Sequence, residues 1–258
     1  MSTVLYFQGS VAALYGTGAL LLGFGQHRRQ RLAIALGFTG LVLHLGLLAW
    51  RWQDIGQIPI VTRYEDLTVD ALAIVLVFLA AQWRLPELRP AGVLALAAAG
   101  LGVTWALFHS RGTFPMDPSL RTNWLIIHAQ LNSFAIGAAT LAAGVHVAWL
   151  AGRLDAPDTP VLAGRLTGWT FFLWMAMVMA GSYWASLAWG RFWGWDPIES
   201  WSFATAMAYA FVLHLRHRPA WRGKRWAAVA LVPYAMMLFT TYGLLLVRRS
   251  IHGQYLFQ

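Results

Sequence analysis

Residues 183–201 read Tyr-Trp-Ala-Ser-Leu-Ala-Trp-Gly-Arg-Phe-Trp-Gly-Trp-Asp-Pro-Ile-Glu-Ser-Trp. This segment holds five of the 15 tryptophans of the chain, together with two glycines, an arginine, an aspartate and a proline. The charges and helix breakers do not suit a lipid-facing helix, and the indoles do not suit a polar loop. The composition therefore indicates a surface that receives a large, flat and apolar ligand.

The overall composition predicts an integral membrane protein. Of the 258 residues, 59% are hydrophobic and 11% are charged, and the mean hydropathy is +0.55. Soluble domains have about 25% charged residues, and about 20 apolar residues cross the membrane as a helix. We predict one all-α, polytopic domain over residues 1–258 with about eight transmembrane helices. Their centres lie near Leu14, Leu41, Leu76, Gly100, Gly137, Met175, Met207 and Met236.

The first ten residues contain Leu-Tyr-Phe-Gln-Gly-Ser, which is reminiscent of a protease-cleavage scar. We interpret this stretch as the native start of the first helix because the apolar run continues through it, and a scar is the alternative. No basic segment precedes the run, so a cleaved signal peptide is not expected.

The basic residues predict the orientation in the membrane. The net charge is +9, but Lys and Arg lie in short clusters between apolar runs, where they orient a membrane protein, so we set nucleic acid aside. If successive loops alternate between two sides, twelve of these residues fall on one side, which is predicted to be cytoplasmic. The seven on the outer side are Arg51, Arg63, Arg111, Arg121, Arg191, Arg248 and Arg249.

Three histidines share the outer face with the tryptophan-rich segment, which lies between helices six and seven. His128 lies where helix five begins, and His252 follows helix eight. Both are placed to flank the segment. His109, at the end of helix four, is interpreted as a solvated loop residue.

Three other histidines lie deeper or on the inner side. His44 interrupts the apolar helix from about Arg31 to Trp50, and it is either functional or a neutral imidazole bonded to a neighbouring helix. His146 follows His128 by 18 residues, which at about 1.5 Å each places the two at opposite faces. His214 is either a ligand or a helix-end residue bonded to a free carbonyl.

Haem is the ligand that this combination favours. Neutral imidazoles bind haem iron, indole faces stack on a macrocycle, and guanidinium groups pair with propionates. An interfacial aromatic belt and phospholipid headgroups are the alternative explanations for the tryptophans and for the last arginine pair. The arginines assigned to the propionates are Arg121, Arg191, Arg248 and Arg249.

Four acidic residues can be explained as helix caps. Glu65 and Asp66 lie at the start of helix three, where acids cap free N–H groups and complement the helix dipole. Asp196 and Glu199 either orient a ligand or cap helix seven.

The segment from Trp189 to Trp201 resembles the tryptophan-rich WWD motif of the cytochrome c assembly family, and specifically its CcsA type from the System II pathway. The resemblance covers most of the chain. It extends to Gly181, Trp184, the run from Tyr209 to Arg216, the segment from Trp124 to His128, the loop from Pro59 to Leu67, and His252.

This resemblance implies that the WWD segment, about residues 183–201, holds haem b on the outer face, with His128 and His252 as the axial ligands. His214 matches a transmembrane histidine that holds haem on its way outward, and its companion ligand lies in the partner subunit CcsB in fused relatives. His44 is our alternative within the chain, and His146 is a weaker one. The other residues assigned to the haem site are Trp184, Trp189, Trp193, Trp195, Asp196 and Trp201.

Two positions depart from the family pattern without touching an assigned ligand. Ile198 stands where a lysine is usual, and Ala129 stands where a valine is usual.

The resemblance implies a haem lyase component that attaches haem to the Cys-X-X-Cys-His segment of apocytochrome c, with a CcsB-like subunit as partner. The chain has no cysteine, so thiols come from the substrate and its reducing system. The membrane is the bacterial cytoplasmic membrane or the thylakoid, with the site facing the periplasm or lumen. The alternatives are a CcmC-like haem delivery subunit without lyase activity, a haem-b electron-transfer protein, and a structural subunit.

Overall fold

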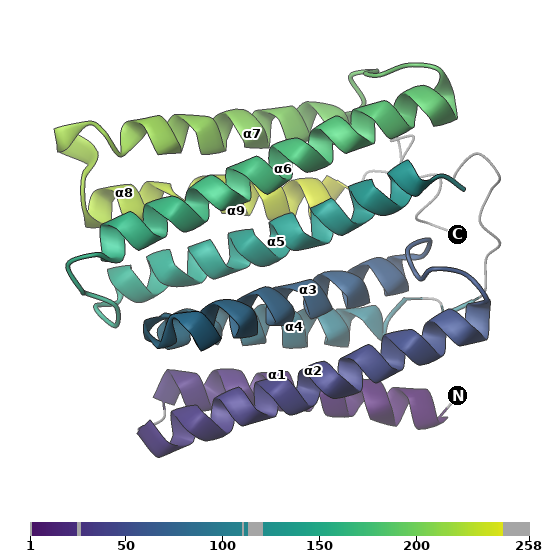
Figure 1. Cartoon of the computed structure of the whole chain (residues 1–258), viewed down its shortest axis with the longest axis horizontal. Helices are drawn as coiled ribbons and strands as arrows, with labels where there is room; N and C mark the ends of the chain where they lie inside the picture. The colour runs from purple at the N-terminus through teal and green to yellow at the C-terminus, as the bar shows by residue number, and fades with distance from the viewer. Residues whose placement is uncertain (1, 25–26, 110, 113–120, 245–258) are drawn as a thin grey trace.

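The structure is a computed structural model that describes residues 2–24, 27–109, 111–112 and 121–244. These residues form helices and connecting turns without a strand, as predicted (Figure 1). The helices are α1 Ser2–Phe24, α2 His27–Ile55, α3 Arg63–Arg84, α4 Gly92–Ala106, α5 Asn123–Leu150, α6 Thr159–Trp189, α7 Pro197–Leu215, α8 Lys224–Val229 and α9 Leu231–Leu238. Short helical turns cover Pro86–Ala91 and Pro219–Trp221, and η4, Phe239–Gly243, is a π-helix.

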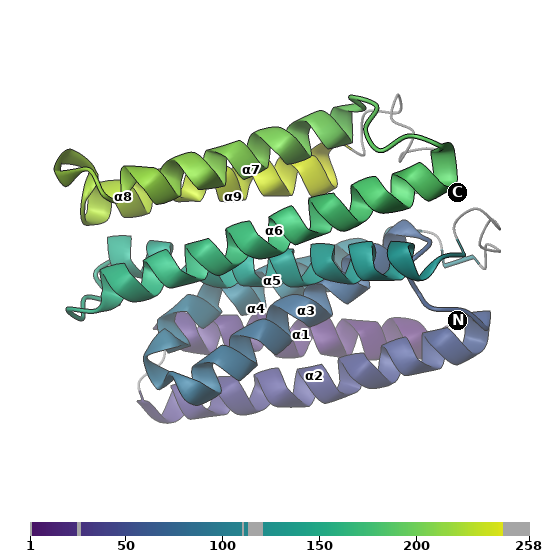
Figure 2. The same cartoon turned by 45° about the horizontal axis from the view of Figure 1, so that its top comes forward.

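The helix α5 forms the centre of the bundle, with α1 to α4 on one side and α6 to α9 on the other (Figures 1 and 2). It contacts α3, α4, α6, α8 and α9, and 15 of its residues are buried. Small residues permit this close packing. A Cβ atom on Gly137 would lie 2.9 Å from the carbonyl oxygen of Ala73, and one on Gly144 would lie 2.6 Å from that of Ala91. Such glycines let membrane helices approach closely.

Seven helical segments in the described ranges are long and apolar enough to cross a membrane. The last of them, Lys224–Gly243, joins α8, α9 and η4. The predicted span without a counterpart among these seven is the seventh, centred near Met207, which corresponds to the 19-residue helix α7. Its first turns carry the polar residues Glu199, Ser200 and Ser202, which lower its hydropathy. The polytopic all-α fold is confirmed, whereas the number eight remains a prediction.

The loops alternate between the two ends of the bundle. The connections α2–α3, α4–α5 and α6–α7 lie at one end, which we call the tryptophan end, and the connections α1–α2, α3–α4, α5–α6 and α7–α8 lie at the opposite end (Figure 1). The twelve basic residues assigned to the cytoplasmic side all lie at or near the opposite end. Within the described residues, the structure thus separates the basic side chains between the two ends as predicted, while Arg248 and Arg249 lie outside those residues.

A buried ion pair holds the tryptophan end together. The Nε and Nη2 atoms of Arg51 donate to Oε1 of Glu65 at 3.1 and 2.9 Å. Arg51 also donates to the carbonyl oxygens of Arg111 and Gly112 at 3.0 and 2.9 Å, so it joins α2, α3 and the loop after α4. Glu65 completes a capping box with Thr62 at the start of α3, which confirms the predicted cap.

Replacing Glu65 by Ala leaves the buried Arg51 guanidinium without its carboxylate, and Arg51 is only 3% exposed. We expect the free energy of unfolding to fall by about 3–5 kcal/mol. Asp54→Ala is the matched control because Asp54 lies 3.6 Å from the same arginine but its side chain is 45% exposed. We expect that control to cost about 0–1 kcal/mol. Unfolding in detergent measures both values, and equal losses would show that the buried pair does not hold this end together.

Candidate functional site

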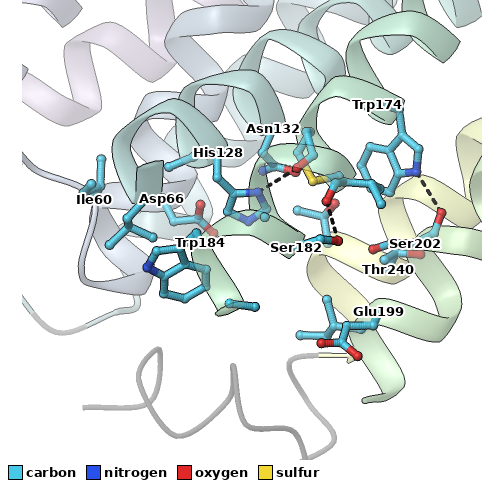
Figure 3. A pocket seen from close by; sticks show the side chains of 18 of the residues that line it. Ile60, Asp66, His128, Asn132, Trp174, Ser182, Trp184, Glu199, Ser202 and Thr240 are labelled. Carbon is cyan, nitrogen blue, oxygen red and sulfur yellow. Dashed lines mark hydrogen bonds between the residues drawn. The ribbon is translucent and has the colours of Figure 1, made fainter. Parts of the chain in front are cut away.

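A cavity of about 200 Å³ lies at the tryptophan end between α5, α6 and the start of α7. The α2–α3 loop, the first turn of α3, and η4 complete its wall. Figure 3 shows His128, Asn132, Trp184 and Glu199 among the side chains that surround it. The cavity therefore collects residues from well-separated segments of the chain.

The imidazole of His128 is held in a defined orientation at this cavity. Its Nδ1 atom lies 3.0 Å from the carbonyl oxygen of Met177 on α6. Because a carbonyl only accepts, Nδ1 carries the hydrogen and the lone pair of the neutral ring is on Nε2. The ring of Trp184 stacks on the imidazole with centroids 6.0 Å apart and planes 13° from parallel. A histidine fixed in this way is suited to bind a metal through Nε2.

Gly181 makes room for this histidine. A Cβ atom on Gly181 would lie 2.6 Å from Cε1 and 2.7 Å from Nδ1 of His128. Real Cβ contacts are essentially never this short, so only glycine allows the ring to lie against α6 while it donates to Met177. Gly181 is one of the residues on which the family resemblance was based. The structure explains why a glycine stands there, since any side chain would overlap the His128 ring.

The five predicted tryptophans occupy different places. Trp184 and Trp193 line the cavity, and Trp189 packs edge-on against Trp184 with centroids 4.8 Å apart. Trp195 is 70% exposed and touches Trp193 at a centroid distance of 6.0 Å. Trp201 packs on Phe239 of η4, at 4.8 Å, rather than on the cavity.

A single carboxylate shapes the turn that carries Trp195. Oε2 of Glu199 accepts from the backbone N–H groups of Gly194 and Asp196, at 2.7 and 3.1 Å. Trp195, which lies between these two donors, has φ +58°, a strained value for a residue other than glycine. Asp196 caps α7 through the N–H of Ile198 at 2.9 Å, so the structure assigns both acids to the capping box.

The predicted propionate partners are placed only in part. Arg191 is exposed, and its guanidinium lies over Gly194, where a Cβ atom would come within 2.5 Å of Cζ. Arg121 is exposed and precedes the N-cap of α5. Arg248, Arg249 and the predicted ligand His252 lie outside the described residues. The preceding η4 residues Thr240 and Thr241 line the cavity.

His44 and His214 do not come together. His44 is fully buried on α2, and its Nδ1 lies 3.2 Å from the hydroxyl of Tyr15 on α1. His214 is exposed near the end of α7, and its Nδ1–H donates to the carbonyl oxygen of Ala210 at 2.7 Å. The helices α2 and α7 lie on opposite sides of the bundle (Figure 2).

His146 and His109 have local partners. His146 lies 3.0 Å from the hydroxyl of Thr167, and its ring meets the edge of Trp226 at 4.9 Å. His109 follows α4, where burial and the nearby Arg63 guanidinium hold the pKa of His109 below its usual value. Neither histidine lines the cavity.

Some polar residues of the cavity wall escape prediction from the sequence. The interpretation of Asp66 as a helix cap is incomplete, because it lines the cavity and forms an ion pair with Arg63 at 2.7 Å. Asn132, Thr240 and Thr241 also line the cavity without having been predicted. One sequence feature could have predicted that α3 contributes to the site: it is an apolar helix that contains acidic residues, and ionisable groups are costly in a membrane.

The sequence profile of the family described as Cytochrome C assembly protein matches residues 59–252, well over half of the chain. The chain belongs to the cytochrome c assembly protein family. The resemblance found in the sequence is therefore confirmed, and cytochrome c biogenesis with haem handling is the family's field of action. The matched range contains the whole cavity wall described above.

Several relatives carry the name cytochrome c biogenesis protein CcsA. The Chlamydomonas reinhardtii protein is 26% identical over 237 residues, which cover 85% of this chain and 67% of that protein. The proteins of Gloeobacter violaceus and of Synechococcus sp. strain CC9605 are each 26% identical, over 97% of this chain and 95% of their own length.

The cavity residues fit haem. His128 offers Nε2 of an oriented neutral imidazole, Trp184 and Trp193 provide flat apolar walls, and the other wall residues are mostly apolar. The hydroxyl of Thr241, which also lines the cavity, is buried and has no hydrogen-bond partner within the described residues. A buried polar atom without a partner is the kind of group that a ligand satisfies.

Gly181→Ala tests the orientation of the histidine. The added Cβ displaces the His128 ring from the Met177 carbonyl, so we expect a haem-loaded variant to lose most of its low-spin absorption spectrum. Gly168→Ala on the same helix is the control, since a Cβ there meets nothing within 4 Å. An unchanged spectrum in the Gly181 variant would contradict the proposed orientation.

Glu199→Ala tests the turn that carries Trp195. Loss of the carboxylate leaves the Gly194 and Asp196 amides unpaired, and we expect unfolding to become about 0.5–2 kcal/mol easier, with a shift in tryptophan fluorescence. Glu199→Gln keeps an acceptor oxygen and is expected to retain most of the stability. Equal behaviour of the two variants would show that the carboxylate oxygen does not hold the turn.

Proposed function

We propose that this chain is the CcsA-like subunit of a cytochrome c synthase and that it holds haem b at the tryptophan end for covalent attachment to apocytochrome c. The observation that carries the proposal is the His128 imidazole, which two groups of α6, the Met177 carbonyl and the Gly181 backbone, hold at the wall of the cavity. The family match supports the same assignment.

With haem bound, His128 would hold the iron through Nε2, and His252 would supply the second ligand. Thr240 and Thr241 support this pairing because they line the cavity 12 and 11 residues before His252. A cavity of about 200 Å³ takes one edge of the macrocycle. It is smaller than the roughly 300–1,000 Å³ of pockets that enclose a drug-sized ligand. The remainder of the group then lies toward the WWD segment and the solvent.

The residues of the chain bind and orient, and the bound group supplies the vinyl carbons to which substrate thiols add. Trp184 and Trp193 exclude water from one face, and the apolar wall keeps the site dry. Arg121, Arg191, Arg248 and Arg249 pair with the propionates. The Cys-X-X-Cys-His segment of the substrate would bring its thiols and its histidine to the group that His128 and His252 would hold. Catalysis then consists mainly of positioning.

His214 holds haem on its way to the cavity together with a ligand from a CcsB-like partner subunit. Its exposure supports this arrangement because the side chain remains accessible to a second protein. His44 is less suited because Tyr15 and the surrounding helices enclose it completely. The cavity faces the periplasm or the thylakoid lumen, and the basic end of the bundle faces the opposite compartment, in keeping with the positive-inside rule.

Two relatives that match 97% of this chain are named cytochrome c biogenesis protein CcsA. Their names favour attachment of haem to the cytochrome over delivery of haem to another carrier. An electron-transfer role is disfavoured by the placement of the histidines. A haem-b electron-transfer protein binds each haem between a pair of buried histidines. His146 would need a second histidine as its partner, but it is hydrogen-bonded to Thr167 instead.

Absorption spectra of the purified protein, co-expressed with its partner subunit, test the ligands. We expect the oxidised and reduced wild type to show a low-spin b-type spectrum that weakens or becomes high-spin in His128→Ala and in His252→Ala. A separate loss in His214→Ala is expected for the second site. His217→Ala, which replaces a histidine three residues away, is the control. Haem that is indifferent to the first two substitutions would overturn the ligand assignment.

A further inference from the structure

A buried carboxylate lies beside the cavity without a direct cationic partner among the described residues. Asp70 on α3 is 1% exposed and accepts two hydrogen bonds from hydroxyl groups. The Ser133 hydroxyl of α5 donates to Oδ1 at 2.6 Å, and the Tyr242 hydroxyl of η4 donates to Oδ2 at 2.9 Å. Ionisable groups inside a membrane span are costly and usually functional.

The surrounding hydrogen bonds satisfy Asp70 in both of its protonation states. The Ser133 hydroxyl has one hydrogen but two acceptors, Oδ1 of Asp70 at 2.6 Å and the carbonyl oxygen of Ala129 at 3.3 Å. With an ionised Asp70, the serine donates to the carboxylate. With a protonated Asp70, the acid donates to the serine, which turns to Ala129. A proton therefore enters or leaves without stranding a buried polar atom.

The charges near Asp70 are few. On α3, Arg63 is ion-paired with Asp66, and its guanidinium lies over the rings of Trp105 and Tyr242 at 5.5 and 5.1 Å. The helices α4 and α9 and the turn η4 contain no charged residue or histidine, and α5 contributes His128 as the titratable group at this end. The helix α2, which also packs against α3, contributes the buried His44 and the buried Arg51, and Arg51 is ion-paired with Glu65. His109 lies beyond Trp105, and its burial together with the nearby Arg63 guanidinium lowers the pKa of His109. Apart from the Arg51–Glu65 pair, the charged groups around Asp70 in the described part of the chain are thus Asp66, Asp70 itself and one cation, Arg63.

The network is continuous with the cavity wall. Asp66, one helical turn before Asp70, lines the cavity, and so does Thr241, the residue before Tyr242. Ala129, the alternative acceptor of the serine, lines it as well and follows His128 directly. A change of charge in the cavity therefore alters the electrostatic energy of the Asp70 carboxylate, because the intervening protein screens charges poorly.

We propose that Asp70 is a proton-binding site that balances the charge of the group held in the cavity. On reduction, an outside one-electron donor converts ferric to ferrous iron, and one proton from water converts the Asp70 carboxylate to the acid. Oxidation reverses both steps. The inference rests on the proposed function, since it requires a redox-active iron in the cavity. If Asp70 acts in this way, the protein stabilises the reduced iron at low pH.

A redox titration of the haem-loaded full chain at several pH values tests the proposal. Two unit charges about 10 Å apart in protein change a proton affinity by roughly tenfold. The midpoint potential of the wild type is then expected to fall by about 59 mV between its acidic and alkaline plateaus. Asp70→Asn is expected to lose this step, and Asp158→Asn, which replaces an exposed acid at the opposite end of the bundle, is expected to keep it.

Tyr242→Phe provides a second readout that does not depend on the stability of the Asp70 variant. It removes a hydroxyl that stabilises the ionised carboxylate, so the step is expected at a higher pH with the same height. Infrared difference spectra on reduction should show a carboxylic acid carbonyl band that is absent in Asp70→Asn. Haem with an unchanged step in both variants overturns this inference alone, and a wild type that binds no haem overturns it together with the proposed function.

Discussion

The contact between His128 and α6 is the constraint on which the functional site depends. A carbonyl of α6 fixes the tautomer and angle of the imidazole, and the ring fits there because Gly181 has no side chain in the space that it fills. The same approach of α5 to α6 sets the distance across which the cavity opens. A larger residue at this crossing would alter the ligand, the cavity and the helix packing together.

The membrane explains why the polar residues are arranged around this contact. Helices satisfy their own backbone groups in lipid, so irregular backbone is confined to the ends of the bundle or to protein-lined cavities. At the tryptophan end, Arg51 neutralises Glu65 and holds two loops, while Glu199 supports the turn of Trp195. These carboxylates organise loop structure, and Glu199 also lines the cavity together with Asp66, which lies one helical turn before Asp70.

Much of the fold and part of the site could be predicted from the sequence. The apolar runs predicted the helices because the length of such a run is a local property, and the alternation of their connections predicted which loops share an end. The density of tryptophans identified the segment, and Trp184 and His128 do face one cavity although they are 56 residues apart. The structure also shows the predicted cap of α7 by Asp196, whose assignment to the haem site stays a prediction.

Other features depend on contacts that no local pattern records. The pairing of Asp70 with Tyr242 joins residues 172 positions apart, and which face of α3 meets α5 is set by packing. The π-helical turn that brings Thr240 and Thr241 to the cavity has no marker in the sequence. Trp201 was assigned to the site because it lies in the WWD segment. On α7, however, its side chain points toward Phe239.

An electron cryo-microscopy map of the haem-loaded protein with its partner tests the central claim most directly. We predict iron bonded to Nε2 of His128, with Nδ1 still within hydrogen-bond distance of the Met177 carbonyl oxygen and the ring against Gly181. Iron bound through other residues, with the His128 ring turned away from the cavity, would contradict it.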